Sequence, residues 1–309
     1  MSGCLFCYKP VEGGLDYHQR CSVKFFGIKN VPELNLDKEL LDKLASQTVN
    51  KRIALTGVQP KLSLTLEKVK GEERLTIVGL WGEYILKPSH EQYQLMPETE
   101  DATMHLADLF KIKTCGHALI RTTNGSLAYI AKRFDRSKGT KIHVEDFCQL
   151  SEFLTGQKYK GSYEKCGKII QQYCTNTGLD ALNFFELVLF SFFTGNNDMH
   201  LKNFSLIHEN NAVKLSPAYD LLNINLIFPA DTEETALTLN GRKRKIELTD
   251  FESLANSLQL VPRAVENLFR NFFNSREKVL NLIESSFLPV DAQIAYITIW
   301  DRKVKQLNG

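Results

Sequence analysis

The sequence predicts an α+β protein with two lobes, a small, mainly β lobe over residues 31–134 and a larger helical lobe over residues 135–309. Short runs typical of strands dominate up to Phe134, whereas longer runs with helical apolar spacing follow it. A chain of 309 residues is long enough to give each lobe a hydrophobic core. A short segment that contains Cys and His, residues 1–30, precedes the two lobes.

The composition is that of an ordinary globular protein, with 43% hydrophobic and 24% charged residues. The net charge of +2 gives no field that favours nucleic acid or a membrane surface, so we expect direct binding to neither. The most apolar run, residues 182–193, is too short to span a bilayer, and the start of the chain lacks the pattern of a secretory signal. Seven cysteines, an odd number, fit a reducing compartment, and we expect a cytoplasmic protein.

The first segment carries four potential metal ligands. Cys4 and Cys7 form a C-x-x-C motif, and His18 and Cys21 follow a Gly-Gly turn. Three thiolates and one imidazole could close a tetrahedral zinc site, which would order a short segment that has no core of its own. The alternative is that the cysteines are buried small hydrophobes or unligated thiols.

The small lobe begins with a predicted packing helix at residues 37–46, followed by a strand-turn-strand at residues 53–66. Backbone N–H groups of such a turn could bind phosphates, although the turn is neither a Walker A loop nor a G-x-G-x-x-G loop. A plain turn is the alternative. The candidate nucleotide-binding residues in this stretch are Thr56, Gly57, Val58, Gln59 and Lys61.

A lysine and a glutamate follow in the order in which kinases place them. Lys87 ends a predicted strand at residues 84–88, and Glu100 lies on a predicted helix that Pro97 opens. In kinases a strand lysine pairs with a helix glutamate and holds the α- and β-phosphates. The alternative for Lys87 is a solvated lysine on an edge strand. A hairpin around an Asn-Gly turn is predicted at residues 118–133.

Helices are predicted over most of the larger lobe. Their ranges are residues 144–154, 163–175, 181–193, 250–258, 262–274, 275–286 and 291–305. The helix at residues 181–193 is apolar nearly all round, which predicts a buried central position. A hairpin at residues 238–245 carries a basic run, for which a solvated end is favoured over a contact with an acidic partner or RNA.

The stretch at residues 195–222 holds the strongest catalytic pattern. Asp198, Asn203 and Asp220 have the spacing of a kinase catalytic loop and its metal aspartate. Asp198 would orient or deprotonate the attacking hydroxyl, and the other two would hold magnesium. A predicted hairpin at residues 204–215 would bring Asp220 back beside Asn203. His200 and Lys202 complete the candidate catalytic set, and the alternative is that these residues are only loop formers.

Taken together, these stretches resemble HipA-type serine/threonine kinases, the toxins of bacterial toxin–antitoxin systems. The resemblance rests on TGVQPK at 56–61, ILKP at 85–88, ETEDATMHLA around Glu100, KRFDR at 132–136, EDFCQL at 145–150, NNDMHLKNFS at 196–205 and SPAYDLL at 216–222. It implies a two-lobed, protein-kinase-like fold and ATP–magnesium chemistry. It also implies that Asp198 is the base and that the adenine contacts the hinge, with Lys132 and Phe134 as its candidate residues.

The resemblance implies partners as well. Known targets of HipA-type kinases are aminoacyl-tRNA synthetases, whose phosphorylation halts translation, and cognate antitoxin proteins bind the kinases. The chain is short for the family and resembles the compact toxins of three-component systems, which lack the extra N-terminal subdomain. Related kinases often autophosphorylate a Ser three positions before the Gly of the loop. Here that position is Ala54, and Thr56 is the nearest hydroxyl.

Two alternatives to a protein kinase remain at this stage. A kinase-like body could serve only to hold partners, without catalysis. The joint presence of Lys87, Asp198, Asn203 and Asp220 argues against this reading. A small-molecule kinase would share the same motif and differ only in its acceptor.

Overall fold

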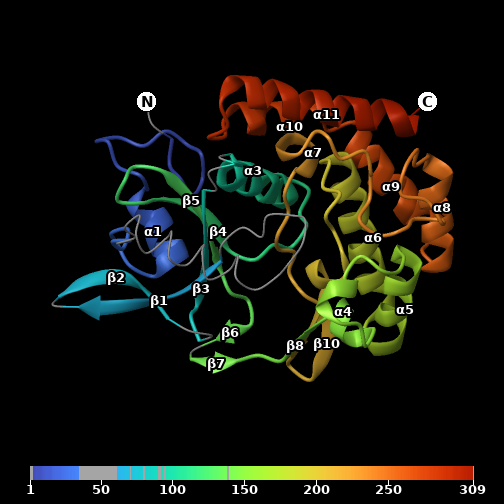
Figure 1. The fold of residues 1–309 in the computed structure, drawn as a ribbon, viewed down its shortest axis with the longest axis horizontal. Coiled ribbons are helices and arrows are strands. Elements are labelled where there is room, and N and C mark those ends of the chain that lie inside the picture. Colours follow the sequence, from blue (N-terminus) through green and yellow to red (C-terminus); the bar gives the residue numbers. More distant parts are fainter. Residues whose placement is uncertain are drawn as a thin grey trace. The chain divides into compact units, whose positions relative to one another are not determined.

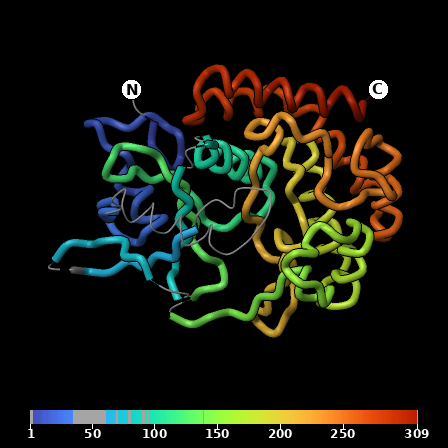
Figure 2. Tube along the Cα trace, viewed as in Figure 1, coloured from blue at the N-terminus to red at the C-terminus, as the bar shows by residue number. Residues whose placement is uncertain are grey.

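The computed structural model describes residues 3–34, 61–69, 71–78, 81–89, 92–93, 95–137 and 139–308. The chain forms two compact units (Figures 1 and 2). The first unit contains residues 1–101, 115–134 and 285–287, and the second contains residues 102–114, 135–284 and 288–309. Among the described residues, no helix is both long enough and apolar enough to cross a membrane.

The first unit is built on a five-stranded antiparallel sheet with the strand order β2-β1-β3-β5-β4. The strands are β1 (Leu62–Val69), β2 (Glu72–Ile77), β3 (Tyr84–Pro88), β4 (His117–Arg121) and β5 (Leu127–Lys132). Gly82 precedes β3 where it approaches β1 closely. A Cβ there would lie 2.4 Å from Ser63 Oγ and 2.6 Å from the Leu64 carbonyl oxygen, so the site requires glycine.

The Cys/His-containing segment is part of this first unit, whereas the sequence suggests a segment without a core. Helix α1 (Gln19–Phe26) buries Phe25 and Phe26, whose rings each lie 5.9 Å from that of Tyr84 in β3. Burying such a ring contributes about 1.5–3 kcal/mol. Leu5 and Val11 join the same core. Hydrophobic packing against the sheet therefore already holds this segment.

The second unit is organised around helix α6 (Thr177–Phe193) (Figure 1). Most of its side chains are buried, as its composition predicts. The rings of Phe193 and Phe272 stack with centroids 5.0 Å apart, and Trp300 packs 5.3 Å from Phe193. Helices α5 (Tyr163–Tyr173), α8 (Leu248–Ser257), α9 (Pro262–Phe273) and α11 (Val290–Asn308) contact α6, and α10 (Arg276–Glu284) packs against α11. Helix α3 (Met96–Leu109) begins in the first unit and ends in the second.

The second unit also contains a three-stranded sheet that positions the candidate catalytic loop. Its strands have the order β10-β9-β8 and are β8 (Val144–Asp146), β9 (Ser205–Glu209) and β10 (Ala212–Leu215). The predicted hairpin at residues 204–215 is therefore present as β9 and β10. The remaining elements in the described part of the chain are β6 (Arg136–Ser137), β7 (Thr140–Lys141), α4 (Phe147–Leu150), α7 (Ile224–Ile227) and the 3-10 turns at Thr155–Gln157 and Leu201–Asn203.

Two predicted elements of the larger lobe differ from the structure. The helix predicted at residues 144–154 is instead strand β8 followed by the single turn α4, because residues 144–146 pair with β9. Asp146 then caps α4 by accepting a hydrogen bond from the Gln149 N–H. The hairpin predicted at residues 238–245 is reduced to one isolated bridge between Leu239 and Arg242. The helix predicted at residues 37–46 lies outside the described residues.

Candidate active site

The candidate catalytic loop starts where α6 ends. Gly195 has a φ of +67°, and a Cβ there would lie 2.9 Å from Asn223 Oδ1, so glycine suits this turn. The chain then passes through Asn196, whose side-chain oxygen accepts a hydrogen bond from the Asp198 N–H at 3.3 Å. The turn and this bond present Asp198 at the start of the loop.

Asp198 is half-buried and is held by a tyrosine from outside the loop. The hydroxyl of Tyr159 donates a hydrogen bond of 2.6 Å to Asp198 Oδ1. Within the described part of the chain, Asp198 Oδ2 accepts no hydrogen bond. A carboxylate oriented through one oxygen, with the second able to accept a proton, has the form that a general base requires.

Asn203 closes the loop from its other end. Its Nδ2 donates a hydrogen bond of 2.9 Å to the Asp198 carbonyl oxygen, and the residue is buried. This bond fixes the orientation of the amide, so the side-chain oxygen of Asn203 is the atom that can ligate a cation. An amide oxygen and a carboxylate are the ligand types that magnesium prefers, so Asn203 and Asp220 fit that ion.

A tyrosine next to Asp220 ties the second loop to the first. The hydroxyl of Tyr219 donates to the Lys202 carbonyl oxygen at 2.9 Å and lies 2.6 Å from Ser205 Oγ. Since the phenol has one proton and gives it to Lys202, Ser205 donates to Tyr219. The predicted return of the chain toward the catalytic loop is therefore present, and Tyr219 fixes it.

The backbone of Asp220 is in the left-handed region, with a φ of +59°. Such a conformation is costly for a residue other than glycine, although Asp and Asn tolerate it best. Conformations of this kind cluster at functional sites, where the surrounding structure compensates the strain. The conformation is therefore consistent with a functional position.

His200 lies within the loop as a buried, uncharged side chain. Burial lowers the pKa of His200, against the opposing fields of Asp198 and Asp220, so the ring is neutral at physiological pH. Its ring packs edge-on against that of Tyr159, with centroids 5.0 Å apart. His200 thus supports Tyr159, and through it Asp198.

Lys202 is engaged elsewhere in the second unit. Its ammonium forms an ion pair of 2.7 Å with Asp146, the residue that caps α4. Asp146 binds the Gln149 N–H through its other oxygen. Lys202 therefore ties the candidate catalytic loop to α4.

The candidate phosphate-binding pair lies in the first unit. Lys87 on β3 and Glu100 on α3 are both buried, and their charged atoms are 2.5 Å apart. Lys87 Nζ also lies 5.4 Å from the centre of the Tyr129 ring. The predicted lysine–glutamate pair is present, and Lys87 is a buried lysine with a partner rather than a solvated edge residue.

The other nucleotide-binding candidates belong to the first unit as well. Lys132 ends β5 and reaches over the Tyr84 ring at 5.9 Å, and Phe134 is the last residue of the unit before Asp135. Lys61 is exposed just ahead of β1. Ala54, Thr56, Gly57, Val58 and Gln59 lie outside the described residues.

Sequence reasoning missed three residues that shape this site, namely Tyr159, Asp146 and Tyr219. Tyr159 and Asp198 are separated by 39 positions, and no motif links them. Tyr219 directly precedes Asp220, so a signal for it was present in the SPAYDLL stretch. The role of Asp146 depends on the pairing of β8 with β9, and the helix that the sequence predicts at residues 144–154 does not include this pairing.

We predict that Tyr159→Phe lowers the rate of phosphoryl transfer about tenfold while leaving the affinity for nucleotide unchanged. The substitution removes one hydrogen bond to a charged group, worth about 1.5–3 kcal/mol, of which only the part that orients Asp198 affects the rate. Steady-state kcat and KM for ATP test this. A variant with unchanged kcat would show that Tyr159 does not position Asp198.

Several known proteins are similar to this chain. A family model described as the HipA-like C-terminal domain matches residues 53–280. A putative kinase of Haemophilus influenzae is 27% identical over 289 residues, covering 83% of this chain and 82% of the relative. A putative kinase of Sinorhizobium fredii is 34% identical over 220 residues, covering 66% of this chain and 53% of the relative. The serine/threonine-protein kinase toxin HipA of Shewanella oneidensis is 25% identical over 197 residues, which cover 57% of this chain and 44% of the toxin.

Two solved structures share the fold. One is HipA of Shewanella oneidensis in a complex with HipB and operator DNA, with a TM-score of 0.69, 19% identity and coverage of 86% of this chain and 71% of that one. The other is the proinflammatory kinase CtkA of Helicobacter pylori, with a TM-score of 0.54, 13% identity and coverage of 83% and 92%. The fold is thus the two-lobed, kinase-like α+β fold. More specifically, the chain belongs to the HipA-like C-terminal domain family.

Proposed function

We propose that this chain is an ATP- and magnesium-dependent serine/threonine protein kinase. The observation that supports it most is a pair of hydrogen bonds that hold the loop. Asn203 Nδ2 donates to the Asp198 carbonyl oxygen, and the Tyr219 hydroxyl donates to the Lys202 carbonyl oxygen. These bonds tie together the two segments that carry the carboxylates of Asp198 and Asp220 and the amide of Asn203. Fixed acceptor oxygens are what phosphoryl transfer requires, because its catalysis consists mostly of positioning and electrostatic stabilisation.

The proposed chemistry uses each residue in a defined role. The substrate hydroxyl oxygen forms a bond to the γ-phosphorus, the bond from that phosphorus to the ADP oxygen breaks, and the hydroxyl proton passes to Asp198. Asn203 and Asp220 would hold magnesium, whose charge offsets that of the phosphate oxygens. Glu100 holds the ammonium of Lys87, which we assign to the α- and β-phosphates.

We further propose that the kinase acts as a toxin that an antitoxin restrains. The proposal rests on the relation to the toxin HipA, whose solved complex includes HipB and operator DNA. The resemblance of the sequence motifs to HipA-type kinases suggests the proposed substrate, an aminoacyl-tRNA synthetase, whose phosphorylation would halt translation. We expect this chain itself to make no direct contact with nucleic acid, given its net charge of +2.

The test is incubation with ATP labelled at the γ-phosphate and a bacterial lysate, followed by identification of the labelled product. A labelled protein that disappears with the Asp198→Asn variant is the expected result. Label found only in a small molecule would favour a small-molecule kinase. Failure to consume ATP with any acceptor would favour a non-catalytic binding module.

We predict that the chain does not autophosphorylate at position 54, whereas Ala54→Ser permits it. A phosphate there would bring about −1.5 to −2 charges near the proposed phosphate-binding loop and would displace that loop from ATP. Intact-mass spectrometry after incubation with ATP and magnesium should show an added phosphate only in the Ser variant. Equal phosphorylation of both forms would place the modified residue elsewhere, with Thr56 the first candidate.

A further inference from the structure

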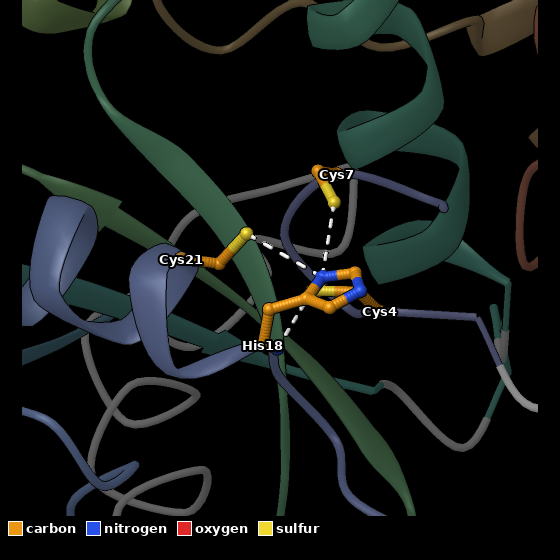
Figure 3. A group of neighbouring side chains, drawn as sticks. All are labelled: Cys4, Cys7, His18 and Cys21. Carbon is orange, nitrogen blue, oxygen red and sulfur yellow. Dashed lines mark hydrogen bonds between the residues drawn. The ribbon is translucent and has the colours of Figure 1, made fainter. Parts of the chain in front are cut away.

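The structure brings together the four Cys and His side chains of the N-terminal segment, a cluster that phosphoryl transfer does not use. The sulfur of Cys7 lies 3.5 Å from His18 Nδ1, and that of Cys21 lies 3.7 Å from the same nitrogen (Figure 3). The sulfur of Cys4 is beside the His18 ring and accepts a hydrogen bond of 3.5 Å from the backbone N–H of His18. All four potential ligand atoms lie within 4.8 Å of one another.

These separations match the edges of a zinc tetrahedron. Zinc binds thiolate sulfur at about 2.3 Å and imidazole nitrogen at about 2.0–2.1 Å, so a sulfur and a nitrogen on one ion are about 3.6 Å apart. The two sulfur–nitrogen distances to His18 Nδ1 are 3.5 and 3.7 Å. One ion could therefore bind both cysteines and the imidazole without a large movement of the chain.

The hydrogen bonding of His18 gives its ring the tautomer that a metal ligand needs. His18 Nε2 lies 2.9 Å from the carbonyl oxygen of Pro10. A carbonyl can only accept, so Nε2 carries the proton, and in the neutral ring Nδ1 has the lone pair. That lone pair is on the nitrogen nearest the thiols. A ligand histidine that donates its other N–H to a backbone carbonyl is the usual arrangement around zinc.

The local backbone supports both halves of the cluster. The N–H groups of Cys7 and Tyr8 both donate to the Cys4 carbonyl oxygen, at 3.2 and 2.9 Å, and form a tight turn. His18 is the N-cap of α1, and Cys21 lies in the first turn of that helix. Residues three apart at a helix start lie on one side, so His18 and Cys21 face the same point.

We propose that Cys4, Cys7, His18 and Cys21 bind one structural Zn²⁺ ion, which fastens the N-terminal segment to edge strand β4 and to helix α3. The Leu119 N–H of β4 donates to the Leu5 carbonyl oxygen at 3.0 Å, inside the C-x-x-C turn. Tyr8 follows that turn, and its hydroxyl donates to Asp101 Oδ2 at 2.7 Å. Asp101 is the neighbour of Glu100 in α3. The ion thus braces the helix that carries the partner of Lys87.

The primary test is the metal content of protein purified without chelator. We expect about one equivalent of zinc in the natural chain, and less than a tenth of that in Cys21→Ser and in His18→Ala. Cys148→Ser is the matched control, since Cys148 is a buried cysteine of the second unit and should leave the zinc content unchanged. Full zinc retention in Cys21→Ser would overturn the proposal.

A second measurement covers the case in which the variants do not fold. Natural protein stripped of metal should bind one equivalent of Co²⁺ and show the visible absorption of a tetrahedral ion with thiolate ligands. Hydrogen exchange at the Leu119 amide should speed up at least tenfold when metal is removed. The absence of both bound zinc and the tetrahedral cobalt spectrum in the natural chain would overturn the proposal.

Discussion

Replacing Asp198 by Asn is expected to lower the rate of phosphoryl transfer about 10²- to 10⁴-fold, the range that general acid–base catalysis supplies. The amide keeps the size of the side chain and can still accept the hydrogen bond from Tyr159. It cannot accept the proton of the attacking hydroxyl. The measurement is the initial rate of transfer at saturating ATP.

The fold should survive this change, because Asp198 is half-buried and forms no ion pair among the described residues. Thermal unfolding of the variant should therefore resemble that of the natural chain. Asp291→Asn is a matched control, since Asp291 is an exposed acid in the first turn of α11. An Asp198→Asn variant with more than a tenth of the natural rate would show that another group accepts the proton.

The elements that local pattern could predict are those with strong apolar periodicity. Helix α6 and strands β9 and β10 were visible in the sequence because each presents a continuous or alternating apolar run. The sequence pattern predicts a helix at residues 144–146, whereas these residues form a strand by pairing with β9, about sixty positions later. Pairing over that distance leaves no local signature.

The candidate site shows a similar division between residues that the sequence predicts and residues that it does not. Asp198, Asn203, Asp220, Lys87 and Glu100 stand out because their chemistry requires particular residue types in a fixed order along the chain. The residues that hold them do not. Tyr159 and Asp146 act through hydrogen bonds to residues 39 and 56 positions away. Other side chains with a hydrogen-bond donor or acceptor at the right distance could form such bonds, so no fixed motif marks these two residues. The sequence therefore indicates the reacting groups better than their supports.

Replacing Asp220 by Asn is expected to weaken magnesium-dependent ATP binding at least tenfold, which corresponds to about 1.4 kcal/mol. The carboxylate would hold the magnesium ion, whose charge offsets that of the phosphate oxygens, and the neutral amide would hold the ion more weakly. Asn also tolerates the left-handed backbone at this position, so the variant isolates the loss of charge. Calorimetry with ATP in magnesium and in excess chelator is the measurement.

Two further substitutions at the same position separate charge from backbone strain. Asp220→Ala should lose the same affinity and also destabilise the fold by about 1 kcal/mol, since alanine is poorly suited to a φ of +59°. Asp220→Gly should lose the affinity without that extra cost, because glycine adopts the conformation freely. If Asp220→Asn binds ATP in magnesium as tightly as the natural chain, the metal ligand is a different residue and Asp220 is retained for the turn alone.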